Sequence, residues 1–355
     1  MRYVVRIKNK LDNHQMIMLT RSVADIIYES KYIDVIGVEA ESVEQLEKLS
    51  FVDSVRESRV GEFQNGEFLT TIIFEPHVKK SALVNNGLVG WGDTRIAIID
   101  SGINPKDITV TDMIDFSGTG MFDVCNHGNI VTKIVRHFAK AAQLYCAKVG
   151  AYNPDEINVM KAIEWAVDRG ANLINISAGF LRERKYGDKT ISCNNGNCEM
   201  CELVNTVISE TGVAIVVAAG NRDNKENSID CPGNAMNAVT VGAVDKDMKI
   251  ADYSSIGAPG GIKPNIVAPG NGYIDGKMFN GTSFSAPLVT GVLGAILNKS
   301  GNIAKAIEYL YNTADDLDLP RHYQGHGCIN IERLVGEVTK NETLNCDSSR
   351  QNQNS

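Results

Sequence analysis

The sequence predicts an α/β fold, a mostly parallel sheet with helices on both faces, preceded by a small α+β domain. The main evidence is that short, nearly continuous apolar runs alternate with segments of helical spacing over most of the chain. Such runs are typical of strands buried on both faces of a parallel sheet, and the alternation is typical of α/β domains. The length of 355 residues favours two domains, at about 150 residues per domain.

Residues 1–64 are predicted to form the small α+β domain. Gly61 and Gly66 allow the chain to turn at its end, which favours a boundary there. The expected elements are strands over 3–7, 32–39 and 52–60 and helices over 21–30 and 42–49.

Residues 65–340 are predicted to form the α/β domain. Its apolar runs predict strands over 95–99, 143–147, 172–176, 213–217 and 238–241, and its helical spacing predicts helices over 130–139, 156–169 and 199–210. One more helix is expected over 284–297, where the absence of any charged residue requires burial on every side. Residues 341–355 are polar and are expected to be disordered.

Composition limits the partners. The net charge of -8 gives no general attraction to phosphate backbones or anionic lipids, so nucleic acid and membranes are not expected partners. The N-terminus lacks the apolar stretch of a secretory signal, and no run of apolar residues is long enough to cross a bilayer. The expected location is therefore the cytoplasm.

Four polar residues stand where a parallel sheet builds its sites. Asp100 and Asn221 follow predicted strands, His127 stands at the entrance of a predicted helix, and Ser283 directly precedes the uncharged helix. An acid, an imidazole and a hydroxyl suit nucleophilic catalysis, and an amide can donate to an oxyanion. Taken singly, each also fits a turn, a loop or a helix cap.

The order Asp, His, Ser, with the Asn between His and Ser, is the order found in subtilisin, and the chain resembles the subtilisin-like serine proteases, the subtilase family. The matching motifs are Asp100-Ser101-Gly102, His127-Gly128, Ser177-Ala178-Gly179, Ala219-Gly220-Asn221 and Gly281-Thr282-Ser283. The resemblance implies a subtilisin-like catalytic domain over 65–340 and a serine endopeptidase that hydrolyses peptide bonds through an acyl-enzyme.

The resemblance also implies a role for each matching residue. Ser283 would be the nucleophile, His127 the general base, Asp100 the group that orients the imidazole, and Asn221 a donor of the oxyanion hole. The segment Ser177, Ala178 and Gly179 would pair with extended substrate backbone.

The small domain resembles the family's inhibitory propeptide, which templates folding and blocks the cleft until it is cut. Residues 1–64 would then be an intramolecular inhibitor, with the cut between Arg59 and Thr70. A permanent accessory domain is the alternative.

The chain departs from the family pattern beside two catalytic residues. Asn129 and Ile130 stand where Thr and His are usual, and Phe284 and Ser285 stand where Met and Ala are usual. Asn129 and Ile130, beside His127, keep a second hypothesis open, a catalytically silent scaffold that binds or regulates through the same cleft.

Asp230 precedes a Pro-Gly pair at the expected floor of the substrate pocket, which suggests a preference for substrates with Arg or Lys. Arg222, directly after Asn221, is expected either to neutralise Asp230 or to attract acidic substrates.

Four cysteines form a second constellation: Cys193, Cys198, Cys201 and Cys231. Their spacing is a weak indication of structural zinc, and the sequence alone favours reduced thiols or a disulfide. No cofactor is expected to be required. Structural calcium is another option, but loop acids without an EF-hand pattern define no calcium site.

Overall fold

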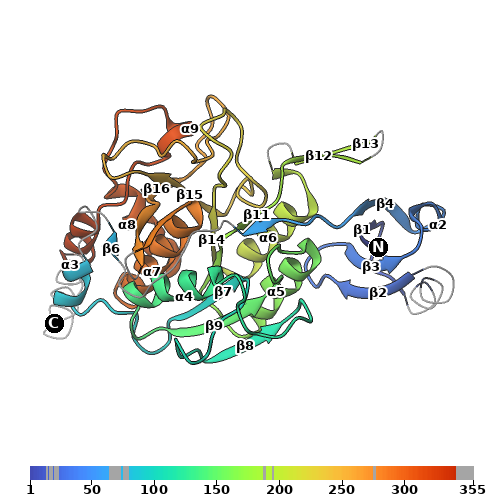
Figure 1. Cartoon of the computed structure of the whole chain (residues 1–355), viewed down its shortest axis with the longest axis horizontal. Coiled ribbons are helices and arrows are strands. Elements are labelled where there is room, and N and C mark those ends of the chain that lie inside the picture. The colour runs from blue at the N-terminus through green and yellow to red at the C-terminus, as the bar shows by residue number, and fades with distance from the viewer. Residues whose placement is uncertain are drawn as a thin grey trace, which may run out of the picture.

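The structure is a computed structural model that describes residues 1–12, 15, 19, 24–63, 73–74, 80–186, 189–193, 196–274 and 277–340. A small domain protrudes from one side of a larger layered domain (Figure 1). The predicted boundary between residues 64 and 65 and the polar tail over 341–355 lie outside the described residues.

The small domain is a four-stranded antiparallel sheet in the order β2-β3-β1-β4. Its elements are β1 (Arg2–Ile7), β2 (Ala24–Glu29), β3 (Val35–Ala40), α2 (Val43–Glu47) and β4 (Val52–Glu57). The helix begins at Ser42, whose hydroxyl accepts from the Glu44 backbone N–H at 3.3 Å.

The helix predicted over 21–30 is wrong, because its described part forms strand β2. Ala24 and Ile26 of this strand face the core of the small domain, whereas Ile27 and Tyr28 face the larger domain. A bulge between Ile26 and Tyr28 further shifts the register with β3. Both faces of the strand are thus covered, so its apolar residues do not alternate strictly and imitate helical spacing.

The larger domain is built on a seven-stranded sheet in the order β16-β15-β14-β10-β7-β9-β8, with every neighbouring pair parallel. The strands are β7 (Arg95–Asp100), β8 (Asp112–Asp115), β9 (Gln143–Lys148), β10 (Leu173–Ile176), β14 (Ala214–Ala218), β15 (Val239–Val244) and β16 (Ile266–Pro269). All five predicted strands are present. The two edge strands, β8 and β16, escaped prediction because each has only four residues, and half of those in β8 are acidic.

Helices cover both faces of this sheet (Figure 1). They are α4 (His127–Phe138) and α7 (Thr282–Ser300) on one face and α5 (Glu156–Asp168) and α6 (Glu199–Thr211) on the other. The alternation of side chains along β7 shows the two layers, because Ile96 and Ile98 pack under α4 and α7 while Ala97 and Ile99 pack under α5. Helix α7 is buried on all sides over residues 282–297, as its lack of charge predicts.

The other elements surround this core. They are α3 (Lys80–Asn85), β6 (Ile73–Phe74), the hairpin β12 (Glu183–Tyr186) and β13 (Lys189–Ser192), β17 (Asn271–Ile274), β18 (Lys277–Asn280), α8 (Ile303–Asn312), α9 (Arg321–Gln324) and a helical segment over 331–340. None of the helices in the described ranges has the length and apolarity that crossing a bilayer requires.

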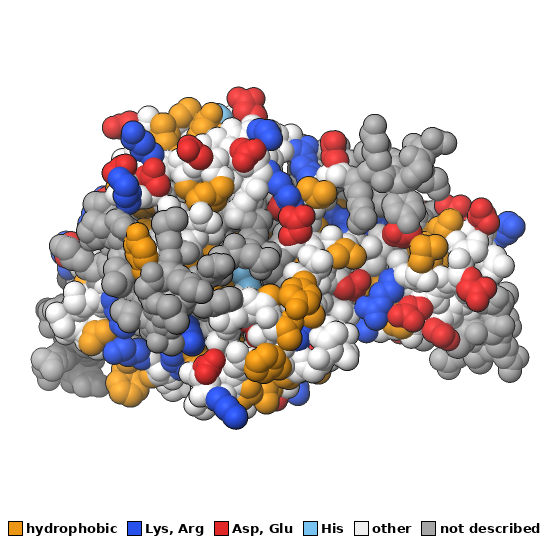
Figure 2. All heavy atoms as spheres, in the orientation of Figure 1, with side chains coloured by type: hydrophobic (Ala, Val, Ile, Leu, Met, Phe, Trp, Pro, Cys, Tyr) orange, Lys and Arg blue, Asp and Glu red, His pale blue; other side chains and the backbone are white. Residues whose placement is uncertain are grey.

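The small domain packs against α5 and α6. The Tyr28 hydroxyl of β2 donates to the buried Glu164 carboxylate of α5 at 2.7 Å. The Arg56 guanidinium of β4 donates to Glu156 of α5 and to Glu199 of α6, each at 2.7 Å. Acidic and basic side chains gather at this junction (Figure 2). The interface therefore combines buried ion pairs with apolar contacts.

Candidate active site

Three neighbouring strands deliver polar residues to one edge of the sheet. Strand β7 ends with Asp100, β10 is followed by Ser177, and β14 leads to Asn221. Because β14, β10 and β7 are adjacent and parallel, these residues lie at the same carboxyl edge. Helices α4 and α7 begin at this edge with His127 and Thr282-Ser283.

The imidazole of His127 is oriented by a buried carboxylate. Its Nδ1 lies 2.8 Å from Asp100 Oδ1, and both side chains are buried. The same oxygen accepts from the Ser101 backbone N–H at 2.7 Å. With Nδ1 bonded to the carboxylate, Nε2 is the nitrogen left to accept a proton from a nucleophile.

A second carboxylate supports this pair. Asp123 Oδ1 accepts from the Ser101 hydroxyl at 2.8 Å, and Asp123 Oδ2 accepts from the Asn129 backbone N–H at 2.8 Å. Ser101 in turn accepts from the Gly128 backbone N–H at 2.9 Å. Burial raises the pKa of Asp123, and the hydrogen bonds oppose that rise. The start of α4, which carries His127, is therefore fixed to the end of β7.

Ser283 is held by its carbonyl as well as its side chain. Pro287 has no N–H, so the Ser283 carbonyl four residues earlier lacks its helical partner. The Ser177 hydroxyl takes that place and donates to the Ser283 carbonyl at 3.0 Å. In return, Ser283 Oγ donates to the Ser177 carbonyl at 3.1 Å. The ring of Phe284, the next residue, lies 5.6 Å from the His127 ring, so the first turn of α7 lies beside the imidazole.

A polar network continues from Ser177 into the core. Its hydroxyl accepts from Asn175 Nδ2 at 2.8 Å, and Asn175 Oδ1 accepts from the Thr290 hydroxyl at 2.9 Å. All of these side chains are buried. Fully bonded buried networks fix one arrangement of their surroundings, so this network sets the position of α7 relative to β10.

The amide of Asn221 has a fixed orientation. Its Oδ1 accepts from the Thr282 backbone N–H at 3.0 Å and from the Thr282 hydroxyl at 2.9 Å. Its Nδ2 is therefore turned to the other side, where a Cβ on Gly281 would come within 3.0 Å of it. Gly281, at φ 144°, leaves open the space in front of the amide donor.

The expected substrate strand already has a partner strand. Strand β11 (Ala178–Gly179) pairs antiparallel with β5 (Glu62–Phe63), with Ala178 opposite Phe63 and Gly179 opposite Glu62. One residue earlier, a Cβ on Gly61 would lie only 2.7 Å from the Gly179 carbonyl oxygen. The segment that leaves the small domain thus runs along β11, the expected substrate strand, and Gly61 permits the close approach.

Asp230 lies beside this edge, but its carboxylate is paired. Arg222 Nε lies 3.2 Å from both of its oxygens, and Arg222 Nη1 also contacts Glu62 at 3.2 Å. Burial raises the pKa of Asp230 to about 6, against the lowering effect of Arg222. Arg222 therefore pairs with Asp230, the first of the two alternatives left open by the sequence, and attraction of acidic substrates stays a prediction. The suggested preference for Arg or Lys loses its physical basis.

The departures from the family pattern are accommodated. The Asn129 amide donates to Asp107 at 3.0 Å and to Asn126 at 2.9 Å, and Ile130 lies in the core. Reasoning from the sequence missed the supporting roles of Asp123, Thr282, Asn175 and Thr290. For the last two a signal existed, because each is a polar residue inside an otherwise apolar buried segment.

The described geometry suits acyl transfer. A hydroxyl at a helix start, an imidazole with a bonded carboxylate, a fixed amide donor and an edge strand for extended peptide lie together at one rim of the sheet.

Comparisons with known proteins agree with this chemistry. A model of the Subtilase family matches residues 92–327. Alkaline elastase YaB of Bacillus sp. (strain YaB) is 27% identical over 335 residues, which cover 87% of this chain and 81% of the relative. Subtilisin Savinase of Lederbergia lenta is 28% identical over 276 residues, which cover 72% of this chain and 95% of the relative.

A solved structure also shares the fold. The epidermin leader peptide processing serine protease (EpiP) from Staphylococcus aureus, as an S393A mutant, superposes with a TM-score of 0.74 at 19% sequence identity. The match covers 95% of this chain and 99% of that one, so it extends over the small domain as well as the large one.

Proposed function

The chain belongs to the subtilase family and is a serine endopeptidase, and from that premise we propose that it cuts its own N-terminal domain away as a propeptide. The observation that carries the proposal is the pairing of β5 with β11, which sets the chain's own segment along the substrate-binding edge. A permanent accessory domain would not need to occupy that edge.

In the proposed mechanism Ser283 Oγ attacks the scissile carbonyl while His127 Nε2 takes the hydroxyl proton. Asp100 holds the imidazole through Nδ1 and stabilises its charged form. The developing oxyanion receives hydrogen bonds from Asn221 Nδ2 and from the Ser283 backbone N–H, which belongs to the unpaired first turn of α7. His127 then protonates the leaving amine, and water hydrolyses the acyl-enzyme by the same steps.

The register of β5 predicts the position of the cut. Phe63, the last described residue of β5, lies opposite Ala178, one residue after Ser177, whose carbonyl accepts the Ser283 hydroxyl. The bond expected to be cut is therefore Gln64–Asn65, within the range that the sequence suggested but outside the described residues.

N-terminal sequencing of the purified mature enzyme tests this proposal. The expected product begins at Asn65, and an equimolar fragment of residues 1–64 accompanies it. Recovery of an active enzyme that keeps residue 1, with no fragment formed on prolonged incubation, would show that the small domain is a permanent accessory.

Replacement of Gly61 by alanine is expected to slow self-cleavage about tenfold or more. The added methyl group would lie 2.7 Å from the Gly179 carbonyl oxygen and 2.8 Å from Pro154 Cγ, so β5 must shift away from the edge. Overpacking of this kind costs about 1–3 kcal/mol. A time course of processing after refolding measures the rate, and Val60→Ala, at the exposed neighbouring position, is the control. An unchanged rate for Gly61→Ala would mean that this strand is not the cleaved segment.

Acid is expected to loosen the small domain. Burial would raise the pKa of Glu156, but Arg56 and Arg59 outweigh it and lower the pKa to about 2 from the ordinary 4.5. A lowered carboxyl pKa stabilises the docked state fully above pH 4.5, and that stabilisation, up to about 3 kcal/mol, is lost as the pH falls toward 2. Pepsin digestion of the uncut Ser283→Ala chain should release the small domain faster at pH 2.5 than at pH 4.5. The reason is that the docked state, which protects the linking segment, is less stable at the lower pH.

Glu156→Gln provides the matched control for the acid effect. This variant should release the domain at nearly the same rate at both pH values, after correction for pepsin's own pH dependence. An equal acid response in Glu156→Gln and its parent would assign the effect to other carboxylates.

The proposed location is the cytoplasm. Support comes from the described cysteines outside the tail, all of which are free of disulfides, as a reducing compartment requires. Fractionation of the source cells with an antibody against the mature domain would test it, since recovery from the medium would contradict the proposal.

A further inference from the structure

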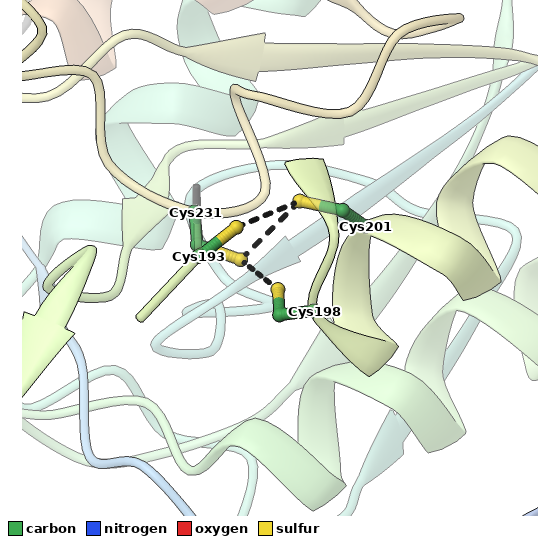
Figure 3. A group of neighbouring side chains, drawn as sticks. All are labelled: Cys193, Cys198, Cys201 and Cys231. Atoms are coloured by element: carbon green, nitrogen blue, oxygen red, sulfur yellow. Dashed lines mark hydrogen bonds between the residues drawn. The ribbon is translucent and has the colours of Figure 1, made fainter. Parts of the chain in front are cut away.

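Four buried cysteines converge beside the substrate-binding edge (Figure 3). Cys193 follows β13, Cys198 is the N-cap of α6, and Cys201 lies in the first turn of that helix. Cys231 follows Asp230 in a separate loop, and its side chain points at the other three (Figure 3). Three segments of the chain thus bring four thiols into one small volume, although none of them takes part in the proposed catalysis.

The distances between the sulfurs distinguish the possible states. The Sγ atoms of Cys193 and Cys201 lie 3.6 Å apart, those of Cys198 and Cys231 3.0 Å, and those of Cys201 and Cys231 3.5 Å. All four lie within 4.8 Å of one another. A disulfide requires about 2.05 Å and joins sulfurs in pairs. Tetrahedral zinc with Zn–S bonds of about 2.3 Å holds its four sulfurs about 3.8 Å apart. The observed sulfur–sulfur distances, from 3.0 Å to at most 4.8 Å, span this value.

We propose that Cys193, Cys198, Cys201 and Cys231 bind one zinc ion as a structural tetrathiolate site. Each thiol loses its proton on binding, so a Zn²⁺ ion and four thiolates form a centre of net charge −2. Four protein sulfurs fill the tetrahedral shell and leave no position for water, which assigns the ion a structural role.

Positive groups already surround the sulfurs. Arg59 of the small domain directs Nη2 at the Sγ atoms of Cys198 and Cys231, at 3.4 and 3.3 Å. The N-terminus of α6, with its unpaired N–H groups, begins at the same cluster and favours thiolates. Hydrogen bonds to ligand sulfurs are a typical outer shell of such sites. Arg59 thus partly neutralises the centre only while the small domain is docked.

The position of the site explains what the ion would hold together. Cys231 and Phe180 exchange two backbone hydrogen bonds, at 2.9 and 3.0 Å, and Phe180 directly follows the substrate strand β11. Asp230, the residue before Cys231, lies so close to that strand that a Cβ on Gly179 would come within 2.8 Å of its side chain. The ion would therefore fix the loop that supports β11 to the start of α6 and to the end of the β12–β13 hairpin.

Metal analysis of the full chain tests the proposal without use of activity. The Ser283→Ala protein, produced without a metal-binding tag and dialysed against a weak chelator, is expected to contain one zinc per chain by plasma mass spectrometry. Cys201→Ala in this background should lower that content at least tenfold. Cys146→Ala, which removes a buried cysteine of β9 outside the cluster, should leave it unchanged.

A second measurement applies where Cys201→Ala does not fold. The Ser283→Ala protein, refolded with Co²⁺ in place of zinc, should show the intense visible bands of tetrahedral tetrathiolate cobalt and lose them when zinc is added. Either of two results would overturn the proposal. One is a chain without metal whose cysteines react fully with a thiol reagent, and the other is an intact mass lowered by the hydrogens lost in disulfides. Failure of self-processing would not affect either readout.

Discussion

Substitution of Ser283 by alanine is expected to lower kcat for peptide hydrolysis by about a millionfold, the loss that removal of the nucleophile causes in subtilisin, a member of the same family. Without Oγ no acyl-enzyme forms, and only the oxyanion donors and substrate binding remain to accelerate attack by water. The same variant should keep residues 1–64 attached. Steady-state hydrolysis of a fluorogenic peptide and intact mass of the purified chain measure the two effects.

Ser285→Ala is the matched control, because its hydroxyl is equally buried in α7 but donates to the Ala268 carbonyl, away from the imidazole. It should retain activity. A fluorophosphonate probe should label wild type and Ser285→Ala and leave Ser283→Ala unmarked. If the wild-type chain is neither labelled nor active, the catalytically silent scaffold becomes the better hypothesis.

Substitution of Asn221 by leucine is expected to lower kcat by about 10²–10³-fold, about 3–4 kcal/mol of transition-state stabilisation, with little change in KM. The reason is that Thr282 fixes Oδ1 by two hydrogen bonds, so Nδ2 is aimed before the substrate arrives and contributes fully once the oxyanion develops. Leucine keeps the volume of the side chain but has no donor.

Kinetics with one peptide at several concentrations separate kcat from KM for this variant. Asn85→Leu changes an exposed amide at the end of α3 and should leave both constants unaltered. A raised KM with an unchanged kcat in Asn221→Leu would indicate that Asn221 binds the ground state and is not an oxyanion donor.

The central strands could be predicted, and candidate site residues could be named, because each carries a local signal. Fully buried strands such as β10 and β14 are continuous apolar runs, and Asp100, His127 and Ser283 stand directly at the ends of such elements. Strand β2 gave a misleading signal, because a partner from another domain covers its second face. The pairing of β5 with β11 and the network from Asn175 to Thr290 depend on contacts more than 100 residues apart along the chain, which no local pattern records.

The cysteine cluster and the Arg222–Asp230 pair also could not be predicted from local sequence patterns. The spacing of the cysteines contains no information on how Cys231 approaches the other three, because that approach depends on the loop after β14. The partner of Arg222 could likewise be identified only from distances in the structure, where its guanidinium contacts both Asp230 and Glu62.

If the proposed self-cleavage holds, the pairing of β5 with β11 makes the chain's own segment the first competitor of peptide substrates. A tethered segment is present at a millimolar-range effective concentration that dilution of the protein does not change. Free peptides must therefore be abundant to displace it before the cut. Afterwards the severed piece competes only at its actual concentration, so the onset of turnover should depend on how dilute the enzyme is and on how quickly the severed piece is degraded.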